Sequence, residues 1–370
     1  MVATFPSVQA DDEWSPLKSV IVGRAGRACF PSAPAPMIEA TMPSAHTHRF
    51  QPHSPFDETL IAKAEAELDY FAAILQAEGI NVYRPPVGIN WLDENGYTGA
   101  MPRDGLMSVQ NTLIEACFAW PCRNREIEIA FKPILDDLAR DARVTIVRRP
   151  ASSFAETLLD SNESDDGTNS SSSSRTGGAN GTGQWVINNS RPAFDTADFM
   201  RFGQTIIGQF SHVTNQAGVD YIQAQLPTGY KIEMLEVDDP HAMHIDATIL
   251  PLREGLLAYN PKKVSEAALR KHAVLADWDL RPYPFTPKEP GEDSPPLYMT
   301  SPWLCLNALV LDGERVVVEI SDVQTAQWFE SLGMKCIRCP FKHVNSIGGS
   351  FHCATVDLVR EKTKASTSVN

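Results

Sequence analysis

Apolar and polar positions recur along the chain in one order, five times over. Each repeat begins with a short apolar run, often a strand, a turn and a second strand. It continues with a helical stretch and closes on a short strand. Apolar residues in the helical stretches recur at steps of three and four, as at Ala64, Leu68, Phe71 and Leu75. The predicted repeats cover residues 19–86, 111–150, 184–237, 248–285 and 307–341.

Repeats of this size predict an α/β fold built from modules arranged radially or in line, because one module alone cannot bury both its sheet and its helix. In the third repeat the pattern predicts a first strand within 184–194, a helical stretch over 199–226 and a closing strand within 230–237. A doubly wound sheet would require a glycine-rich phosphate loop after an early strand. The stretch 22–30 offers only two glycines in a GxxG pattern, so the modular fold is favoured.

Polar residues with catalytic potential open the second and fourth modules, lie within the third, or follow the fifth. Inserts between modules gather on one face of such a fold, so we expect these residues to converge at one mouth although they are far apart in sequence. They are Asp104, Asp195, His244, Asp246 and Cys353.

Residues 161–183 interrupt the repeats with a Ser-, Gly-, Asn- and Asp-rich segment that cannot form a core. We interpret it as a disordered insertion within a single catalytic domain spanning residues 1–370, with a polar tail at 362–370.

The net charge of −14 argues against a nucleic-acid partner and suits a small cationic substrate. No apolar run approaches the ~20 residues needed to cross a bilayer, and the N-terminus lacks the pattern of a secretory signal. Seven cysteines at irregular spacing do not form a disulfide framework, which favours a reducing, cytoplasmic setting.

Metal binding has weak support in the sequence. Cys336 and Cys339 form a CxxC, but without a second pair they are interpreted as strand residues. His241 and His244 lie three apart and lack a third ligand in context. No metal and no cofactor are therefore expected.

The stretch Asn345–Cys353, NSIGGSFHC, is the strongest candidate for chemistry. Gly348 and Gly349 allow backbone conformations that other residues avoid, so Cys353 can be presented at the end of a tight loop. A thiol acts as a nucleophile only when it is ionised, which requires a nearby base or positive charge. The structural alternative is a turn followed by a buried core cysteine.

An imidazole and carboxylates complete this set. His244 and Asp246 are two residues apart, so on an extended backbone they would face the same side. Asp104 stands at a predicted loop-to-strand boundary. Asp195 and Asp198 open a predicted helix, and we interpret Asp198 as its N-cap. A nucleophilic cysteine, a general acid–base and carboxylates for a cation form a coherent site.

Several motifs between Trp14 and Arg360 resemble the amidinotransferases, in matching order and spacing. The motifs are MPRDGLM, FDTADF, SHVTN, MHIDAT, TSPWL and GGSFHCATVDL. The resemblance implies the pentein fold, a five-bladed α/β propeller of ββαβ-type modules. It also implies a homodimer, as in many family members, and a reaction that uses no cofactor.

The resemblance further implies a reaction in two halves. Cys353 would attack the guanidino carbon of L-arginine, and His244, oriented by Asp195, would protonate the departing L-ornithine. An acceptor amine would then take the amidino group from the cysteine. Asp104 and Asp246 would hold the guanidinium, and further positions match the substrate pocket. These are Met243, Ser301 with Thr300 beside it, His241 and Lys263.

Two of these positions depart from the glycine-using members of the family. His241 stands where they carry asparagine, and Lys263 where they carry an arginine that meets the substrate carboxylate. Lysine supplies a positive charge but cannot donate the two parallel hydrogen bonds with which arginine binds a carboxylate, so the sequence does not identify the acceptor amine. Two alternatives also remain, an arginine deiminase-like guanidine hydrolase on the same fold and a non-catalytic arginine-binding protein.

Overall fold

The computed structural model describes residues 6–32, 35–41, 49–154, 157–158, 185–291 and 293–362. The predicted insertion at 161–183 and all of the predicted tail except Lys362 lie outside this part of the chain. No helix within the described ranges is both long and apolar enough to span a membrane.

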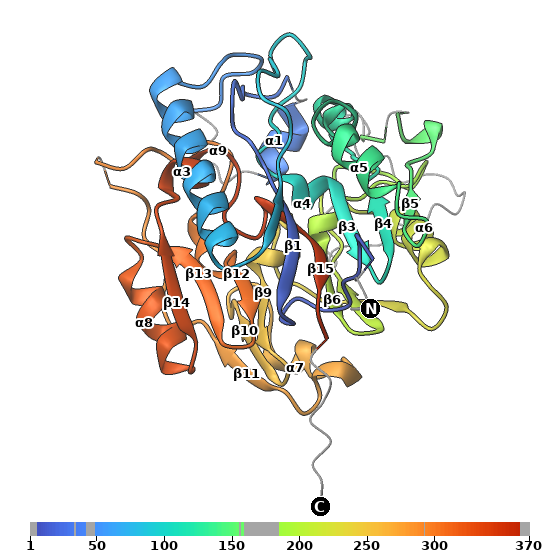
Figure 1. Ribbon diagram of the computed structural model, residues 1–370, viewed down its shortest axis with the longest axis vertical. Coiled ribbons are helices and arrows are strands. Elements are labelled where there is room, and N and C mark those ends of the chain that lie inside the picture. The colour runs from blue at the N-terminus through green and yellow to red at the C-terminus, as the bar shows by residue number, and fades with distance from the viewer. Residues whose placement is uncertain are drawn as a thin grey trace, which may run out of the picture.

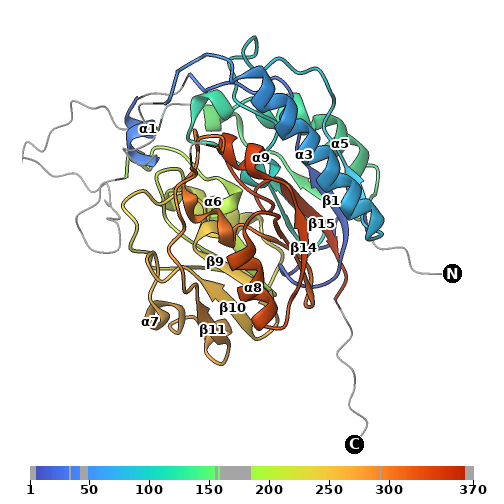
Figure 2. The same cartoon turned by 90° about the vertical axis from the view of Figure 1, so that its left-hand side faces the viewer.

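Five three-stranded sheets make up the fold, and each has the same topology. In every sheet the middle strand pairs antiparallel with one neighbour and parallel with the other. In four sheets an antiparallel hairpin followed by a helical crossover to a parallel strand produces this arrangement, whereas in the first sheet the antiparallel neighbour comes from the other end of the described chain. The sheets surround a common centre (Figures 1 and 2). Toward the periphery lie the helices α3 (Glu58–Ala77), α5 (Lys132–Leu138), α6 (Gln216–Gln225), α7 (Glu266–Leu269) and α8 (Val323–Ser331). The prediction of five ββαβ modules is confirmed.

The first blade joins the two ends of the described chain. Its middle strand β1 (Leu17–Val22) pairs antiparallel with β15 (Thr355–Arg360) and parallel with β2 (Asn81–Tyr83). Figure 1 shows β1 and β15 side by side near the centre of the molecule. Helices α1 (Ala35–Thr41) and α3 (Glu58–Ala77) lie between β1 and β2 in sequence.

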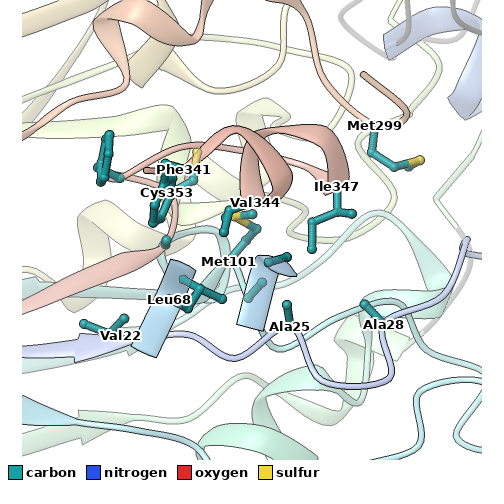
Figure 3. Packing of buried hydrophobic residues seen from close by; sticks show 14 of the residues in the cluster. Val22, Ala25, Ala28, Leu68, Met101, Met299, Phe341, Val344, Ile347 and Cys353 are labelled. Atoms are coloured by element: carbon teal, nitrogen blue, oxygen red, sulfur yellow. The ribbon is translucent and has the colours of Figure 1, made fainter. Parts of the chain in front are cut away.

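Helix α3 follows the predicted spacing. The side chain of Asp57 caps its first turn by accepting a hydrogen bond of 2.9 Å from Leu60 N. All four residues named in its apolar stripe are buried in the largest core cluster. Cys353 belongs to the same cluster, together with Phe341, Val344 and Ile347 (Figure 3).

The remaining blades follow in chain order. The second contains α4 (Pro102–Gly105), β3 (Leu106–Val109), β4 (Thr112–Glu115), the 3-10 helix Pro121–Arg123, the π-helix Ile127–Phe131, α5 (Lys132–Leu138) and β5 (Thr145–Val147), followed by the 3-10 helix Ala151–Phe154. The third contains the 3-10 helix Thr196–Asp198, β6 (Phe199–Phe202), β7 (Thr205–Gly208), α6 (Gln216–Gln225) and β8 (Lys231–Met234).

The fourth and fifth blades match their predicted strands closely. The fourth contains the 3-10 helix Ile245–Ala247, β9 (Ile249–Arg253), β10 (Leu256–Tyr259), α7 (Glu266–Leu269), the 3-10 helix Ala273–Leu275 and β11 (Asp279–Pro282). The fifth contains the 3-10 helix Pro302–Leu306, β12 (Leu309–Asp312), β13 (Arg315–Glu319), α8 (Val323–Ser331), β14 (Lys335–Cys339) and α9 (Lys342–Ile347). Cys336 and Cys339 lie in β14, as predicted.

The prediction for the third module is wrong in its first half. The hairpin β6–β7 lies inside the stretch 199–226 that was predicted to be helical, and the helix proper starts only at Gln216. The described residues of the stretch 184–194 contain no strand, only isolated bridges at Ile187 and Phe194. Gly203 with φ of 71° turns the hairpin, and a short run such as FMRF before a turn fits a strand as well as a helix.

Candidate active site

The candidate residues meet where one strand of each sheet begins, namely the strand that pairs antiparallel with the middle strand; in the first blade this is β15, the last strand in the chain order. One or two polar side chains stand just before each of these strands, so the five modules deliver them to one end of the fold. Asp104 precedes β3, Asp195 precedes β6, His244 and Asp246 precede β9, Asn307 precedes β12 and Cys353 precedes β15. The structure therefore brings these residues to one end of the fold, as the sequence predicts.

Two glycines set the loop that carries Cys353. Gly348 has φ of 153°, in a region that residues with a Cβ avoid. A Cβ at Gly349 would lie 2.6 Å from Cys353 Cβ and 2.9 Å from Met101 Sδ. Cys353 therefore sits against a bare backbone, in the turn that leads into β15.

Asn307 makes two hydrogen bonds to Cys353 and a third to the loop that precedes it. Its Nδ2 donates to Cys353 Sγ at 3.0 Å, and its Oδ1 accepts from the backbone N of Cys353 at 3.1 Å and of Ser350 at 3.2 Å. Since Asn307 is buried, these bonds replace contacts with water and fix the thiol in place. Sequence reasoning did not assign a role to Asn307. Its position directly before a first strand, like that of Asp104, was the available signal.

His244 lies between two carboxylates. Its Nε2 is 3.0 Å from Asp195 Oδ2, and its Nδ1 is 3.6 Å from Asp104 Oδ1. A ring nitrogen of His244 and the sulfur of Cys353 also lie within 4.8 Å of each other. The structure thus brings together the imidazole, the thiol and the carboxylate that were predicted to act as a unit.

His244 and Asp246 do not lie on an extended backbone, contrary to prediction. His244 has φ of 66° and ψ of 118°, and the 3-10 turn Ile245–Ala247 follows it. The backbone N of His244 donates to Asp198 Oδ1 at 2.8 Å, which holds this left-handed conformation. The turn, not strand alternation, aims both side chains at the thiol.

Asp198 is not a helix N-cap. It is the last residue of a one-turn 3-10 helix, and Asp195 occupies the residue before that turn. The Asp198 carboxylate instead accepts from Ser211 Oγ and Thr214 Oγ1, both at 2.6 Å, and from His244 N. Burial raises the pKa of Asp198 to about 6 despite these bonds. Its partners lie in the next loop, so the local sequence could not reveal them.

Asp246 contacts the thiol from the other side. Its Oδ2 accepts from Cys353 Sγ at 3.2 Å and lies 2.8 Å from His352 Nδ1. His352 Nε2 in turn lies 3.5 Å from Glu13 Oε2. The pKa of Asp246 is lowered, because His352 and the neighbouring groups outweigh the opposing effect of burial.

A buried arginine supports the carboxylates behind His244. Arg123 Nη1 lies 2.8 Å from Asp104 Oδ2 and 3.3 Å from Asp195 Oδ2, while its Nη2 lies 2.9 Å from Glu126 Oε2. The guanidinium also lies 4.7 Å from the centre of the Phe118 ring. Neither Arg123 nor His352 was identified from the sequence, where an isolated arginine or histidine carries no signal.

Electrostatics keep the thiol protonated and the imidazole charged in the free site. Burial, with the negative charge of Asp246, raises the pKa of Cys353 to about 12. Burial opposes the charged form of His244, but Asp104 and Asp195 outweigh it and the pKa of His244 lies well above its ordinary value. The site thus has an acid ready and needs added positive charge to form a thiolate.

A cavity of about 310 Å³ opens in front of the thiol. Cys353, His244, Asp246 and Asn307 all line it. Further lining residues include every pocket position that was predicted, namely His241, Met243, Lys263, Thr300 and Ser301. Asp104 and Asp195 do not line this cavity.

Two cavity residues already have partners. Lys263 Nζ lies 2.9 Å from Asp239 Oδ2, and His241 Nδ1 lies 2.7 Å from the carbonyl oxygen of Ala40 in α1. Lys263 therefore presents its charge together with a carboxylate. His241 is directed at α1, away from a metal site shared with His244.

The chain matches no protein-family model. It is 38% identical to an L-arginine:L-lysine amidinotransferase from Pseudomonas savastanoi pv. phaseolicola, over 94% of this chain and 93% of that protein. It is 36% identical to the mitochondrial glycine amidinotransferase of Danio rerio, over 96% of this chain and 83% of that protein. The solved structure of SxtG, an amidinotransferase of the saxitoxin biosynthetic pathway from Microseira wollei, superposes with a TM-score of 0.81 at 31% identity, covering 96% of this chain and 98% of that one.

Proposed function

The chain belongs to the amidinotransferase family, and from that premise we propose that it moves the amidino group of L-arginine to an acceptor amine through Cys353. Its five-sheet arrangement is the pentein fold. The observation that carries the proposal is the placement of Cys353 Sγ between Asp246 Oδ2 at 3.2 Å and the amide of Asn307 at 3.0 Å, within 4.8 Å of a ring nitrogen of His244.

Carboxylate oxygens without a hydrogen-bond partner support the binding of L-arginine. One carboxylate oxygen each of Asp104 and Asp246 is buried without a hydrogen-bond partner. A guanidinium carries five N–H donors in one plane and pairs well with carboxylates. A guanidinium held by Asp246 would place its carbon beside Cys353 Sγ. Because buried unpaired acceptors are costly, filling them favours the cationic substrate.

Activation of the thiol follows from the same charge. In the free site, burial and Asp246 hold the pKa of Cys353 at about 12. A bound guanidinium offsets the carboxylates and favours the thiolate, so the thiol releases its proton to the solvent as the donor binds. The nucleophile is thereby formed only when there is a substrate for it to attack.

In the first half-reaction, the thiolate attacks the guanidino carbon and a C–S bond forms. The imidazolium of His244 gives its proton to the departing nitrogen, the C–N bond breaks and L-ornithine leaves. The amidino group then remains on sulfur as a cation, beside Asp246. His244 is left neutral, with Asp195 fixing the orientation of its ring.

In the second half-reaction, the acceptor amine attacks the same carbon. Neutral His244 takes the proton that the amine loses, the C–S bond breaks and a new guanidino product leaves. Lys263 and Asp239 form an ion pair and both line the cavity in front of the thiol, where we expect the acceptor to bind. The two relatives are named for L-lysine and for glycine, so these amino acids are the first acceptors to test.

The test is intact-mass analysis after mixing the protein with L-arginine. We expect an amidino adduct on Cys353, and release of L-ornithine that becomes catalytic when the right amine is added. Cys353→Ala should lose turnover by at least about 10⁴-fold, since it removes the nucleophile. Cys336→Ala, in the distant strand β14, is the matched control and should react normally.

Two outcomes would contradict the proposal. Unchanged turnover in Cys353→Ala would remove the covalent mechanism altogether. Citrulline and ammonia from arginine alone, with no effect of added amines, would instead indicate a guanidine hydrolase on the same fold.

A further inference from the structure

Two consecutive residues contact the same oxygen atom of Asp246. Cys353 Sγ lies 3.2 Å from Asp246 Oδ2, and Nδ1 of His352 lies 2.8 Å from that oxygen. The second oxygen, Oδ1, is buried and has no hydrogen-bond partner among the described residues. Asp246 lines the cavity in front of the thiol, whereas His352 does not. The His352 imidazole can therefore influence a ligand in the cavity through this carboxylate.

The proton in the contact between His352 and Asp246 lies on the histidine. Burial favours the neutral form of Asp246, but His352 and the neighbouring groups outweigh it and the pKa of Asp246 is lowered. An ionised carboxylate only accepts hydrogen bonds, so His352 Nδ1–H donates to Oδ2 and leaves Oδ1 for a ligand. We propose that His352 is a positioning residue, which fixes the Asp246 carboxylate so that one oxygen faces the sulfur and the other binds the guanidinium of the donor.

The other ring nitrogen of His352 connects it to the charged centre of the fold. His352 Nε2 lies 3.5 Å from Glu13 Oε2. Arg201 holds the Glu13 carboxylate through its Nε and its Nη2, both at 2.7 Å, and its Nη2 also lies 2.6 Å from Asp357 Oδ2. All of these side chains are buried. The imidazole thus lies between the carboxylate of the cavity and a network of charges outside it.

The backbone of His352 is also held on both sides. Its N–H donates to the carbonyl oxygen of Asn307 at 3.2 Å. Its own carbonyl oxygen accepts from the backbone N and the Oγ1 of Thr355, both at 3.1 Å. Because backbone and ring are both anchored, the direction of the Nδ1–H bond is set before a substrate binds. Groups that are oriented in advance need no reorganisation during the reaction.

The position of Asp246 matters in both half-reactions of the proposed function, on which this inference rests. A guanidinium bound by Oδ1 has its carbon beside Cys353 Sγ, and the amidino cation that forms on sulfur stays next to the same carboxylate. A misplacement of about 1 Å at a reacting group can cost ~10²-fold in rate. A residue that fixes Asp246 therefore acts on the binding of the donor and on its reaction.

Two amide variants separate the two nitrogens of His352. In His352→Asn the amide nitrogen is as many bonds from Cα as Nδ1 and can still donate to Asp246. In His352→Gln it corresponds to Nε2 and can contact Glu13 instead. We expect kcat/KM for L-arginine to fall by about 10²–10³-fold in His352→Gln and to stay within about 10-fold of native in His352→Asn. A merely structural role predicts no such order, since glutamine fills more of the space of the ring than asparagine.

Binding of L-arginine provides a second measurement that does not require turnover. In a Cys353→Ala background, calorimetry should show that L-arginine binds about 10- to 100-fold more weakly with His352→Gln than with His352→Asn. His272→Gln is the matched control, because His272 is also buried and its Nδ1 lies 2.9 Å from Glu233 Oε2, outside the cavity. It should keep native affinity and turnover.

Thermal melts establish that each variant is folded. His352→Leu, which lacks both nitrogens, should lose as much kcat/KM as His352→Gln and replaces it if the glutamine variant does not fold. Equal kinetics and equal affinity in the variants with and without the Nδ1 donor would overturn the role of His352, as would an equal loss in His272→Gln. If the native protein forms the amidino adduct, those results refute only this inference. A native protein that neither binds L-arginine nor forms the adduct refutes the proposed function and this inference with it.

Discussion

At the scale of single residues, the site depends on side chains that hold the reacting groups. Asn307 donates to the sulfur, His352 holds Asp246, and Arg123 holds Asp104 and Asp195. All three supporting residues are buried. Each limits how far its partner can move, which is what a reaction needing near-contact geometry requires.

The hydrogen bond from Asn307 to sulfur gives the first residue-scale prediction. Asn307→Asp keeps an oxygen that can accept from the Cys353 and Ser350 amides, but it replaces the donor to sulfur with a negative acceptor. The thiolate is then disfavoured, so we expect the pKa of Cys353 to rise further and kcat/KM to fall by about 10²–10³-fold.

The measurement is the pH profile of kcat/KM. Its rising limb should move to higher pH in Asn307→Asp, while the melting temperature changes little. Asn81→Asp, in strand β2 away from the cavity, is the control. A profile with an unchanged limb would show that the amide has no influence on the sulfur.

The candidate site was predictable in part, and the difference between residues explains why. Cys353, His244 and the carboxylates stand in motifs whose residue types are unusual together. Asn307 stands alone before an apolar run, and its value depends on contacts with a loop more than forty residues away. Such contacts across modules leave no mark in the local sequence.

At the scale of elements, short turns and loops, not regular strands, position the side chains of the candidate site. His244 has a left-handed backbone before a 3-10 turn, and Cys353 follows two glycines. Strands were predictable where a hairpin turn separated two apolar runs, as for β9–β10 and β12–β13. The hairpin β6–β7 was not predicted because tertiary packing, and not the spacing of its apolar residues, determines that this stretch forms strands.

The bare backbone at Gly349 gives the element-scale prediction. In Gly349→Ala the new Cβ would lie 2.6 Å from Cys353 Cβ, so the loop must shift. A displacement of about 1 Å at a reacting group can cost ~10²-fold in rate, and we expect at least that loss in kcat. The loop is short, so the protein should still fold.

Gly26→Ala is the matched control, because a Cβ there meets nothing within 4 Å. Steady-state kinetics and thermal melts of both variants provide the measurement. Native activity in Gly349→Ala would mean that the close approach to Cys353 is not needed for catalysis.

At the scale of the whole molecule, buried charges at the centre tie the blades together. Arg201, in the first strand of the third blade, lies 2.7 Å from Glu13 Oε2 and 2.6 Å from Asp357 Oδ2 in β15. Its Nη1 also donates to Ser108 Oγ in β3 at 2.9 Å. One guanidinium thus links three blades and the N-terminal segment.

Removing that guanidinium gives the whole-molecule prediction. Arg201→Met leaves the buried carboxylate of Glu13 without its main partner, and we expect a loss of about 3–5 kcal/mol in the free energy of unfolding. Urea denaturation followed by fluorescence measures it. Arg281→Met is the control, since Arg281 is half exposed in its pair with Asp279 and should matter little. Equal midpoints for the two variants would contradict a structural role for the central charges.

The pairing of β15 with β1 has a consequence for biosynthesis. β15 follows every other described strand in order of translation, yet it lies against one of the first and carries the sulfur at its start. While the polypeptide is still emerging from the ribosome, four blades can assemble before Cys353, the proposed nucleophile, has been translated. Closure of the first sheet by β15 and placement of Cys353 beside Asp246 and Asn307 therefore occur in one folding event.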